Sequence, residues 1–514
     1  MIFDIVIIGF GVIGTETLFQ ISKNLKKKQK VKIAIIEKDI NNIPGGVAYS
    51  KKNSRFGFFN NPLRLAPPEF INWIKKEENI KKLIEFIKKN RNYRLNNWLF
   101  INKNFINRNI RKFDEIYFPR LTYSLFLEDK IKKIFNYSNK KNFSLFFFKG
   151  ELVKVKKNKL IVCNTKKKLI EYKPNLNFKK LTFKKKNIRK RPAFLSAVNI
   201  ILGNGLLPPK IINHNGEFKN PNYIWDFYSE GGTLNLINKI NKIKSRKSIN
   251  VVFIGNKAGL LETMPELENF ISNKNFNIKI VTIAPNNLSL EKAEHSKKFE
   301  SFKFKFLIKK NIKKIKKSEE IFNILMKEFK FAKLNGFNKY DVWTWVLKNN
   351  LISNCYSQLS FEEKKKYNEF IFPKIRNNTR YTYPNTIYAK KRLERKKILK
   401  YIKDKVSRIE NFKDKIAIKT NKGKKIIADV LINVSGPVSL TNLDKEVTFI
   451  KSLKKMSGNY NFRGFVANKN FLISKNIYAP GTISSNFNPN RLTIIKAVIQ
   501  NSHKVSNEIL RRLK

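Results

Sequence analysis

The sequence predicts an α/β fold in which parallel sheets are covered by helices on both faces, and three observations carry this prediction. First, residues 3–8 (FDIVII) and 31–37 (VKIAIIE) are short β-branched runs of the kind that form buried parallel strands. Second, a helix is expected between them, over about 12–26. Third, a strand that runs into a glycine returns at 198–203 and again at 250–255. Such alternation of strands and helices is typical of parallel sheets.

The length and composition are those of a globular protein with more than one domain. A chain of 514 residues is too long for one hydrophobic core, so two or three domains are expected. Hydrophobic residues make up 42% of the chain and aromatic residues 13%, which argues against a disordered protein. The surface therefore has to carry most of the charge.

That charge is strongly positive, because 107 Lys and Arg face 38 Asp and Glu and leave a formal net charge of +69. Taken alone, this suggests a polyanion partner such as nucleic acid or an anionic membrane. The residues in excess are Lys, Asn, Ile and Phe, whose codons are AT-rich, so mutational bias accounts for the same composition. A nucleic-acid binder is expected to show a localised basic stripe or a recognisable module, and we find none. No specific nucleic-acid partner is therefore expected, and the Lys-rich stretch at 163–192 is interpreted as a solvated hairpin.

Cysteine and histidine usage excludes two kinds of redox or metal site. Cys163 and Cys355 are far apart and form no CxxC, which removes the dithiol centre of the disulfide reductases and fits a reducing compartment. The histidines are scattered as well: His214, His295 and His503. No zinc or haem spacing can be built from them, so no metal is expected.

The N-terminal residues 1–14 are apolar, but they lack the basic region and the cleavage site of a signal peptide. No stretch approaches the roughly 18 apolar residues that span a membrane. A cytoplasmic protein without a membrane span is expected.

Three glycines follow the first strand in the spacing G-x-G-x-x-G: Gly9, Gly11 and Gly14. The first permits a tight turn, the second lets the backbone approach a pyrophosphate, and the third lets helix and strand pack closely. The phosphates are then expected at the helix N-terminus, beside Val12 and Ile13, where unpaired N–H groups and the helix dipole favour negative charge. This is the fingerprint of a Rossmann-type dinucleotide site.

Glu37 supplies the acidic partner that this motif requires, because it ends the second strand. A carboxylate there can accept hydrogen bonds from both ribose hydroxyls of an adenosine. The glycine motif alone is weak evidence, since a tight turn without a ligand has the same pattern. Strand, glycines, helix, strand and terminal Glu in this order together predict a bound dinucleotide.

Further motifs make the sequence resemble a bacterial family of FAD/NAD(P)-binding proteins, which is similar to flavin N-hydroxylases and includes FAD-dependent urate hydroxylase-like members. The resemblance spans nearly the whole chain. Its motifs are GGVAYS at 45–50, FFNNP at 58–62, FINW at 70–73, FPRLTY at 118–123, LGNGLLPP at 202–209, YIWDF at 223–227 and INVSGP at 432–437.

The resemblance implies FAD as the cofactor and places several residues around it. Gly46, Tyr49 and Asn60 are expected near the flavin ring or its ribityl chain, whereas Gly203 and Gly436 are expected to end strands against the cofactor.

Arg120 is a further cofactor-binding candidate, with Tyr123 close by. A Pro-Arg pair between aromatic residues usually needs a counter-charge, so Arg120 is expected to meet either the FAD phosphates or a substrate carboxylate. For Tyr49, Trp73 and Tyr123, packing in the core is the alternative, because aromatic residues are abundant in this chain.

A second glycine motif, which follows the strand at 250–254, departs from the family pattern. The chain has Gly255 and Gly259, but Lys257 stands where relatives have a glycine, and its side chain occupies the place of an approaching pyrophosphate. The next strand ends in IVTIAPNN (280–287), without an acid for the NAD ribose or an arginine for the NADP phosphate. Because a lysine can still reach a phosphate as a point charge, NADPH or NADH stays open as a second cofactor.

These patterns give a domain organisation. Residues 1–228 are expected to form the first part of a Rossmann-type FAD-binding domain, with a helical insertion at about 67–127 that covers one face of the sheet. Residues 229–424 are expected to form a second Rossmann-like lobe with a helical subdomain, in which helices dominate from about 318 to 404. Residues 425–514 return to the FAD-binding domain.

The functional hypothesis is a FAD-dependent oxidoreductase, and first a monooxygenase that acts on a small nitrogenous or heterocyclic substrate. It rests on the resemblance and on the missing cysteine pair. A second hypothesis is a flavin dehydrogenase with an electron partner other than a nicotinamide, and a third is a basic flavin-binding or polyanion-binding protein without catalysis. The sequence names neither a catalytic side chain nor an oligomeric state.

Overall fold

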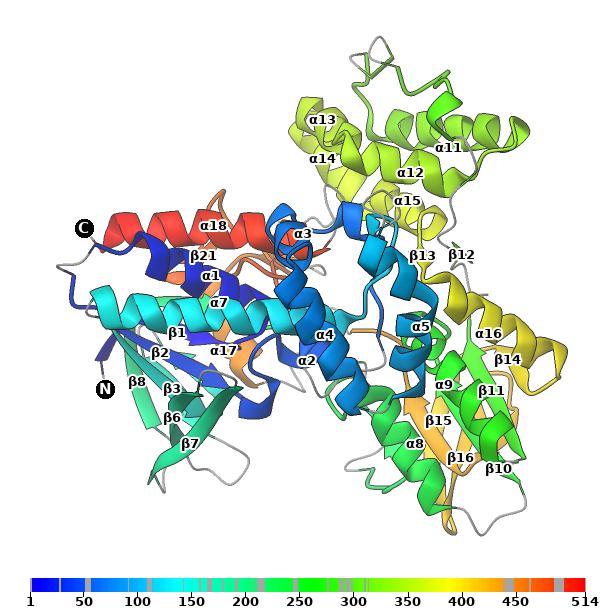
Figure 1. The fold of residues 1–514 in the computed structure, drawn as a ribbon, viewed down its shortest axis with the longest axis horizontal. Helices are drawn as coiled ribbons and strands as arrows, with labels where there is room; N and C mark the ends of the chain where they lie inside the picture. Colours follow the sequence, from blue (N-terminus) through cyan, green and yellow to red (C-terminus); the bar gives the residue numbers. More distant parts are fainter. Residues whose placement is uncertain are drawn as a thin grey trace.

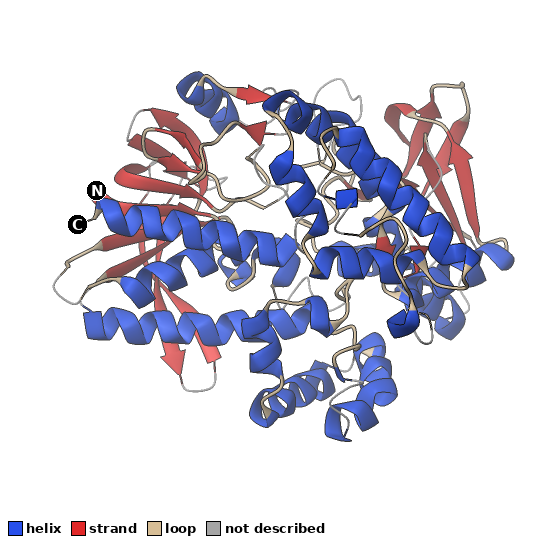
Figure 2. Ribbon diagram, turned by 90° about the horizontal axis from the view of Figure 1, so that it is seen from above, coloured by secondary structure: helices blue, strands red, loops and turns tan. Residues whose placement is uncertain are grey.

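A computed structural model of the chain shows two sheet-containing lobes and a helical subdomain (Figure 1). Seen from above, two groups of strands lie at opposite ends of the molecule with helices between them (Figure 2). The predicted α/β class with parallel sheets is confirmed. The structure describes residues 2–513 except 27–28, 51–56, 91, 109–112, 142, 157–158, 164–168, 178–179, 190–192, 206, 210–217, 244–247, 275–276, 286–290, 293–295, 297–298, 309–310, 313, 438–439, 441–447, 462–463 and 485–493.

The first sheet is assembled from segments that are far apart in the sequence. Its central strands β22, β8, β1, β2 and β3 are parallel neighbours in that order, and the ends of β1, β2 and β8 coincide because Ile8 pairs with both Ile36 and Leu202. The strands are β1 (Ile2–Ile8), β2 (Lys32–Glu37), β3 (Ser144–Lys149), β4 (Glu151–Lys156), β5 (Lys159–Cys163), β6 (Leu169–Asn177), β7 (Lys180–Arg189), β8 (Ala193–Leu202), β21 (Leu472–Ser474) and β22 (Ile477–Tyr478).

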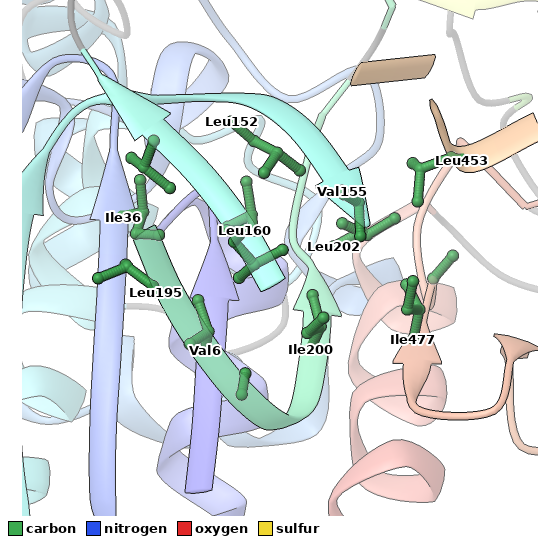
Figure 3. Packing of buried hydrophobic residues seen from close by; sticks show 14 of the residues in the cluster. Val6, Ile36, Leu152, Val155, Leu160, Leu195, Ile200, Leu202, Leu453 and Ile477 are labelled. Carbon is green, nitrogen blue, oxygen red and sulfur yellow. The ribbon is translucent and has the colours of Figure 1, made fainter. Parts of the chain in front are cut away.

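Both faces of the centre of this sheet are buried, which is why β1 and β2 are almost continuously apolar. Three helices, α1 (Val12–Asn24), α7 (Arg120–Lys141) and α18 (Ile494–Arg512), pack over one face (Figure 1). The other face packs against β4, β5 and α17 (Thr448–Ser457), and Figure 3 shows this core between Val6, Leu160 and Leu453.

The helical insertion is not where we expected it. Its helices α3 (Pro68–Ile74), α4 (Glu77–Asn90) and α5 (Tyr93–Arg108) share a core cluster with the start of α7, whereas the part of α7 that covers the sheet begins only at Ile131. The reason is that their aromatic side chains pack on one another, as in the stacked rings of Phe70 and Trp73. These helices lie between the two lobes (Figure 1).

The second sheet is entirely parallel, in the order β14-β11-β10-β18-β9. Its strands are β9 (Tyr223–Ile224), β10 (Ile249–Ile254), β11 (Ile278–Ala284), β14 (Leu399–Lys403) and β18 (Val430–Asn433). Helices α8 (Gly232–Lys242), α9 (Ala258–Lys274) and α16 (Pro384–Arg395) pack on it. The antiparallel sheet β15 (Val406–Phe412), β16 (Lys415–Thr420) and β17 (Lys425–Ala428) adjoins it.

This topology shifts the expected lobe boundaries. Strands β9 and β18 both belong to the second sheet, so divisions at 228 and 424 cut through it. The run at 430–433 reads as a buried parallel strand in either sheet, and only tertiary pairing decides which one it joins.

The helical subdomain forms a separate hydrophobic core. Its helices are α11 (Ser318–Leu334), α12 (Lys339–Lys348), α13 (Leu351–Gln358), α14 (Phe361–Lys366) and α15 (Phe372–Asn378). The helical region ends earlier than expected, because Arg395 closes α16 and β14 follows.

Other expectations concern single features. The Lys-rich stretch does form a hairpin, β6–β7, and Cys163 and Cys355 are free thiols. None of the described helices has the length and apolar character needed to cross a bilayer. His214 and His295 lie outside the described residues.

Candidate cofactor site and the contact between the lobes

The first glycine motif forms a tight junction between β1, α1 and β8. Gly9 has a φ of +85°, and a Cβ built on Gly14 would lie only 2.5 Å from the Gly9 carbonyl oxygen. Gly203, which follows β8, is equally constrained, because its Cβ would lie 2.4 Å from that same oxygen. Glycine at these three positions therefore lets two strand ends and a helix start meet without a steric clash.

Gly11 is different, because packing does not require a glycine there. A Cβ on Gly11 would meet no atom closer than the Gly46 Cα at 3.5 Å, which is ordinary van der Waals contact. Gly46 has a φ of +63°, and its own Cβ would lie 2.9 Å from the Gly11 Cα. The packing of the protein would thus accept a side chain at Gly11. A glycine at such a position is expected where a ligand approaches the backbone.

The start of α1 offers an anion-binding end. Its N-cap, Gly11, has no side chain to cap the helix, and the first turn holds no acidic residue. The N–H groups at Val12 and Ile13 and the helix dipole therefore favour a phosphate there.

Glu37 ends β2 and holds the glycine loop in place. Its Oε2 accepts a hydrogen bond from the Phe10 N–H at 2.8 Å, and its Oε1 accepts one from the Asp39 N–H at 3.3 Å. Burial raises the pKa of the Glu37 carboxyl, and these backbone donors counter the shift. The sequence pattern predicted the acid but not its bond to Phe10. The ribose contact of Glu37 stays a prediction.

Two features that no sequence motif indicated lie beside this loop. Gly481, in the loop after β22, approaches α1 so closely that a Cβ would meet the Ile13 Cδ1 at 2.4 Å. Asn204, next to Gly203, has a buried Oδ1 without a hydrogen-bond partner among the described residues. Buried acceptors normally accept a hydrogen bond. A ligand that donates one to the Asn204 Oδ1 would therefore fit beside the glycine loop. The residues present fit the binding of FAD.

The tyrosines that we considered near the flavin lie in an aromatic cluster. Tyr49 contacts Tyr123, with ring centroids 5.2 Å apart, and burial raises the pKa of Tyr49. Trp73 packs on Phe70 and donates its indole N–H to Asp129 at 3.0 Å. Core packing, the alternative for these aromatic residues, therefore describes their contacts in this structure.

Asn60 and Gly436 meet the second lobe. The Asn60 Oδ1 accepts a long hydrogen bond of 3.5 Å from the Thr382 hydroxyl, just before α16. Gly436 follows β18, so it does not end a strand of the FAD-binding sheet as expected. It is still close to that lobe, because the adjacent Pro437 pairs with Pro209. Flavin contacts of both residues stay predictions.

The counter-charge that we expected for Arg120 is a carboxylate of the second lobe. Its guanidinium pairs with the Glu262 carboxylate on α9, and its Nε–H donates to the Phe58 carbonyl at 3.2 Å. Burial alone lowers the pKa of Arg120, but Glu262 and the nearby tyrosine hydroxyls reverse this and raise it. Glu262 is far away in the sequence, and no local pattern identified it.

A small cavity of about 20 Å³ adjoins this ion pair. It lies between Val47 and Ala48 of the first lobe and Phe227 and Tyr228 of the second. A space of that size holds about one water molecule.

In the second glycine loop, packing against the protein explains why both Gly255 and Gly259 are glycines. Gly255 has a φ of +101°, and its Cβ would lie 2.7 Å from the Val434 carbonyl oxygen. A Cβ on Gly259 would lie 2.8 Å from the Val434 Cγ1. Neither glycine therefore points specifically to a second pyrophosphate.

Lys257, between these glycines, belongs to a cationic cluster. Partial burial lowers the pKa of Lys257, and the charges of Arg380 and Arg376 lower it further. Arg380 directly precedes the short strand β13 (Tyr381–Thr382), which pairs with β12 (Glu291–Lys292) beyond the end of β11. Both arginines near Lys257 therefore come from segments that are distant from it in the sequence. Residues 286–287 of the predicted strand end lie outside the described residues.

Comparisons with known proteins concern the fold as a whole. The structure is similar to the FAD-bound cadaverine monooxygenase of Erwinia amylovora, at 10% identity and a TM-score of 0.50, over 100% of this chain and 94% of that chain. The lysine monooxygenase of Nocardia farcinica also matches, at 10% identity and a TM-score of 0.49 over 98% of each chain. The ornithine hydroxylase of Pseudomonas aeruginosa, in its reduced form, matches at 10% identity and a TM-score of 0.48 over 100% of each.

At the level of sequence, no curated protein matches significantly. A family model does match, and its description is FAD-NAD(P)-binding. The match covers residues 6–171, which include the first glycine motif, Glu37 and Arg120. Residues 6–171 are therefore similar to a FAD-NAD(P)-binding domain, as the sequence motifs predicted.

Proposed function

We propose that the protein is a FAD-dependent oxidoreductase that acts as a monooxygenase on a small nitrogenous or heterocyclic substrate. The observation that carries the proposal is the glycine junction at the start of α1, in which Gly11 is the glycine that the fold itself does not need. The FAD-NAD(P)-binding match and the fold shared with a FAD-bound monooxygenase support it. The free, separate cysteines Cys163 and Cys355 speak against a dithiol mechanism.

Each part of the site has a task in this proposal. The start of α1 binds the pyrophosphate, Glu37 binds the adenosine ribose, and Gly46 and Tyr49 border the flavin. Bound FAD supplies the electron transfer and oxygen chemistry, whereas the protein positions the reactants and keeps water out. The buried aromatic cluster around Tyr123 and the closed contact between the lobes provide that dry environment.

The flavin needs an electron donor, and the cationic cluster at the second glycine loop favours NADPH over NADH. Lys257, Arg376 and Arg380 place three positive charges near one another, and the 2′-phosphate distinguishes NADPH from NADH. We predict that K257A raises the KM for NADPH several-fold and changes the KM for NADH much less. The rate of anaerobic flavin bleaching, followed at several concentrations of each nucleotide, measures this. K333A, at an exposed position on α11, is the matched control and should change neither KM.

The second candidate is a flavin dehydrogenase that passes a hydride to a quinone or to another protein. It is favoured by the second glycine loop, where packing explains Gly255 and Gly259 and neither glycine points to a pyrophosphate. Rapid reduction of the flavin by NADPH would argue against this candidate, because its electron partner is not a nicotinamide.

Reoxidation separates the two candidates. A monooxygenase reduced without air should consume oxygen and release peroxide when air is admitted in the absence of substrate. A reduced flavin that stays reduced in air, and is reoxidised only by a quinone, would contradict the monooxygenase and support the dehydrogenase.

A further inference from the structure

A buried ion pair joins the two lobes. Arg120 begins α7 in the FAD-binding lobe, whereas Glu262 lies on α9 in the second lobe. Their side chains are only 17% and 14% exposed. In such surroundings a charge pair is weakly screened, and removing one partner leaves the other charge buried without compensation.

The arginine is held firmly on its own lobe. Its backbone N–H donates to the Gly57 carbonyl at 2.9 Å, and its Nε–H donates to the Phe58 carbonyl at 3.2 Å. Its stem lies so close to Gly57 that a Cβ there would be 3.0 Å from the Arg120 Cδ. The guanidinium therefore cannot follow Glu262 if the second lobe moves away.

A second arginine contacts the same residue of α9. Arg94, on α5, donates from Nη1 to the Glu262 carbonyl at 3.2 Å, and its guanidinium lies 4.7 Å from the centre of the Phe58 ring. The side chain and the backbone of Glu262 are thus both held by arginines, which come from two different helices outside the second lobe. One turn of α9 is fixed against the segment that precedes Asn60.

The ion pair also borders the small cavity between the lobes. Val47 and Ala48, on one side, belong to the segment that we expect beside the flavin, and Tyr228 lies on the other side. Because that cavity holds about one water, the arrangement seen here leaves no room at this place for a substrate or a nicotinamide.

We propose that Arg120 and Glu262 are positioning residues that hold the two lobes closed over the flavin, and that their ion pair breaks when the lobes open. The pair forms only in the closed arrangement, so it favours that state over the open one. The inference about lobe closure rests on these contacts, and only its kinetic readout rests on the proposed function. Arg120 on this account acts through Glu262 and does not bind the FAD phosphates.

Charge reversal tests this directly. R120E and E262R each place like charges together and should open the lobes, which small-angle X-ray scattering detects as a larger radius of gyration. The double variant R120E/E262R restores opposite charges and should return the radius of gyration to the wild-type value. It should also recover most of the rate of flavin reduction by NADPH, which we expect to fall at least about tenfold in each single variant.

The matched control uses a second ion pair on the same helix. Glu268 of α9 pairs with Arg392 of α16 inside the second lobe, with Nε–Oε1 and Nη2–Oε2 distances of 2.5 and 2.8 Å. E268R and R392E should leave both the scattering and the reduction rate close to wild type. The milder E262Q, which keeps a hydrogen-bond acceptor without the charge, should show an intermediate effect even if a reversal variant fails to fold.

Two results would overturn the inference. One is that both reversal variants fold but scatter as the wild type does. The other is a double variant that is no better than the single ones and has lost FAD, because Arg120 would then contact the cofactor itself. Scattering needs no bound flavin, so a protein without FAD would contradict the proposed function and still test the closure.

Discussion

Replacing Gly11 with alanine is expected to weaken FAD binding at least about tenfold, or about 1.4 kcal/mol, while the fold stays intact. The new Cβ would lie 3.5 Å from the Gly46 Cα, which the protein accommodates without strain. A side chain at this position is expected to hinder the close approach of the pyrophosphate to the backbone. Quenching of FAD fluorescence measures the affinity, and the melting temperature of the FAD-free protein measures the fold.

Gly14 provides the contrast for this experiment. A Cβ there would lie 2.5 Å from the Gly9 carbonyl oxygen, so G14A should lower the melting temperature of the FAD-free protein itself. A G11A variant that binds FAD as tightly as the wild type would show that the glycine junction is only a tight turn.

The largest effect on stability is expected from Lys130, which joins α7 to α1. Its Nζ is 2.8 and 2.7 Å from the two carboxylate oxygens of Glu16 and 2.7 Å from Glu69. The side chains of Lys130 and Glu16 are 5% and 0% exposed. K130M keeps the length and removes the charge, so a buried carboxylate stays unpaired, which costs about 3–5 kcal/mol.

Urea denaturation of the FAD-free protein measures this loss. The neighbouring Lys132 serves as the control, because it is more exposed and lies 3.6 Å from Asp129. K132M should cost less than about 1 kcal/mol, as is usual for exposed ion pairs. A K130M variant that loses no more stability than K132M would mean that the Glu16 carboxyl is already neutral.

The sequence predicted those features of the fold and of the site that depend on residues close together in the chain. Gly9, Gly11, Gly14 and Glu37 were found because a strand, a turn and a helix that bind a dinucleotide need those residue types at that spacing. The same local logic correctly identified the β6–β7 hairpin and the strand at 249–254.

What the sequence could not predict depends on tertiary pairing. Strand β18 is apolar on both faces and would suit either sheet, so only its pairing with β10 assigns it to the second lobe. Glu262 was missed for the same reason. The need of Arg120 for a counter-charge was visible in the sequence, but its partner lies 142 positions away, on a helix of the other lobe.

The interpretation of Lys257, which departs from the glycine motif, changes once its neighbours in the structure are known. In the sequence it either blocks a pyrophosphate or reaches a phosphate as a point charge. In the structure it stands near Arg376 of α15 and Arg380 before β13, two arginines that are distant from it in the sequence. A cluster of this kind cannot be recognised before the second lobe is assembled.

The most direct test of the account is whether the purified protein binds FAD. After reconstitution with excess FAD and removal of the free cofactor, the account predicts a flavin absorbance spectrum and the release of about one FAD per chain on denaturation. Binding of FMN in place of FAD would contradict the assignment of Glu37 and the α1 start to an adenosine diphosphate moiety. A protein that retains no flavin would contradict the central claim.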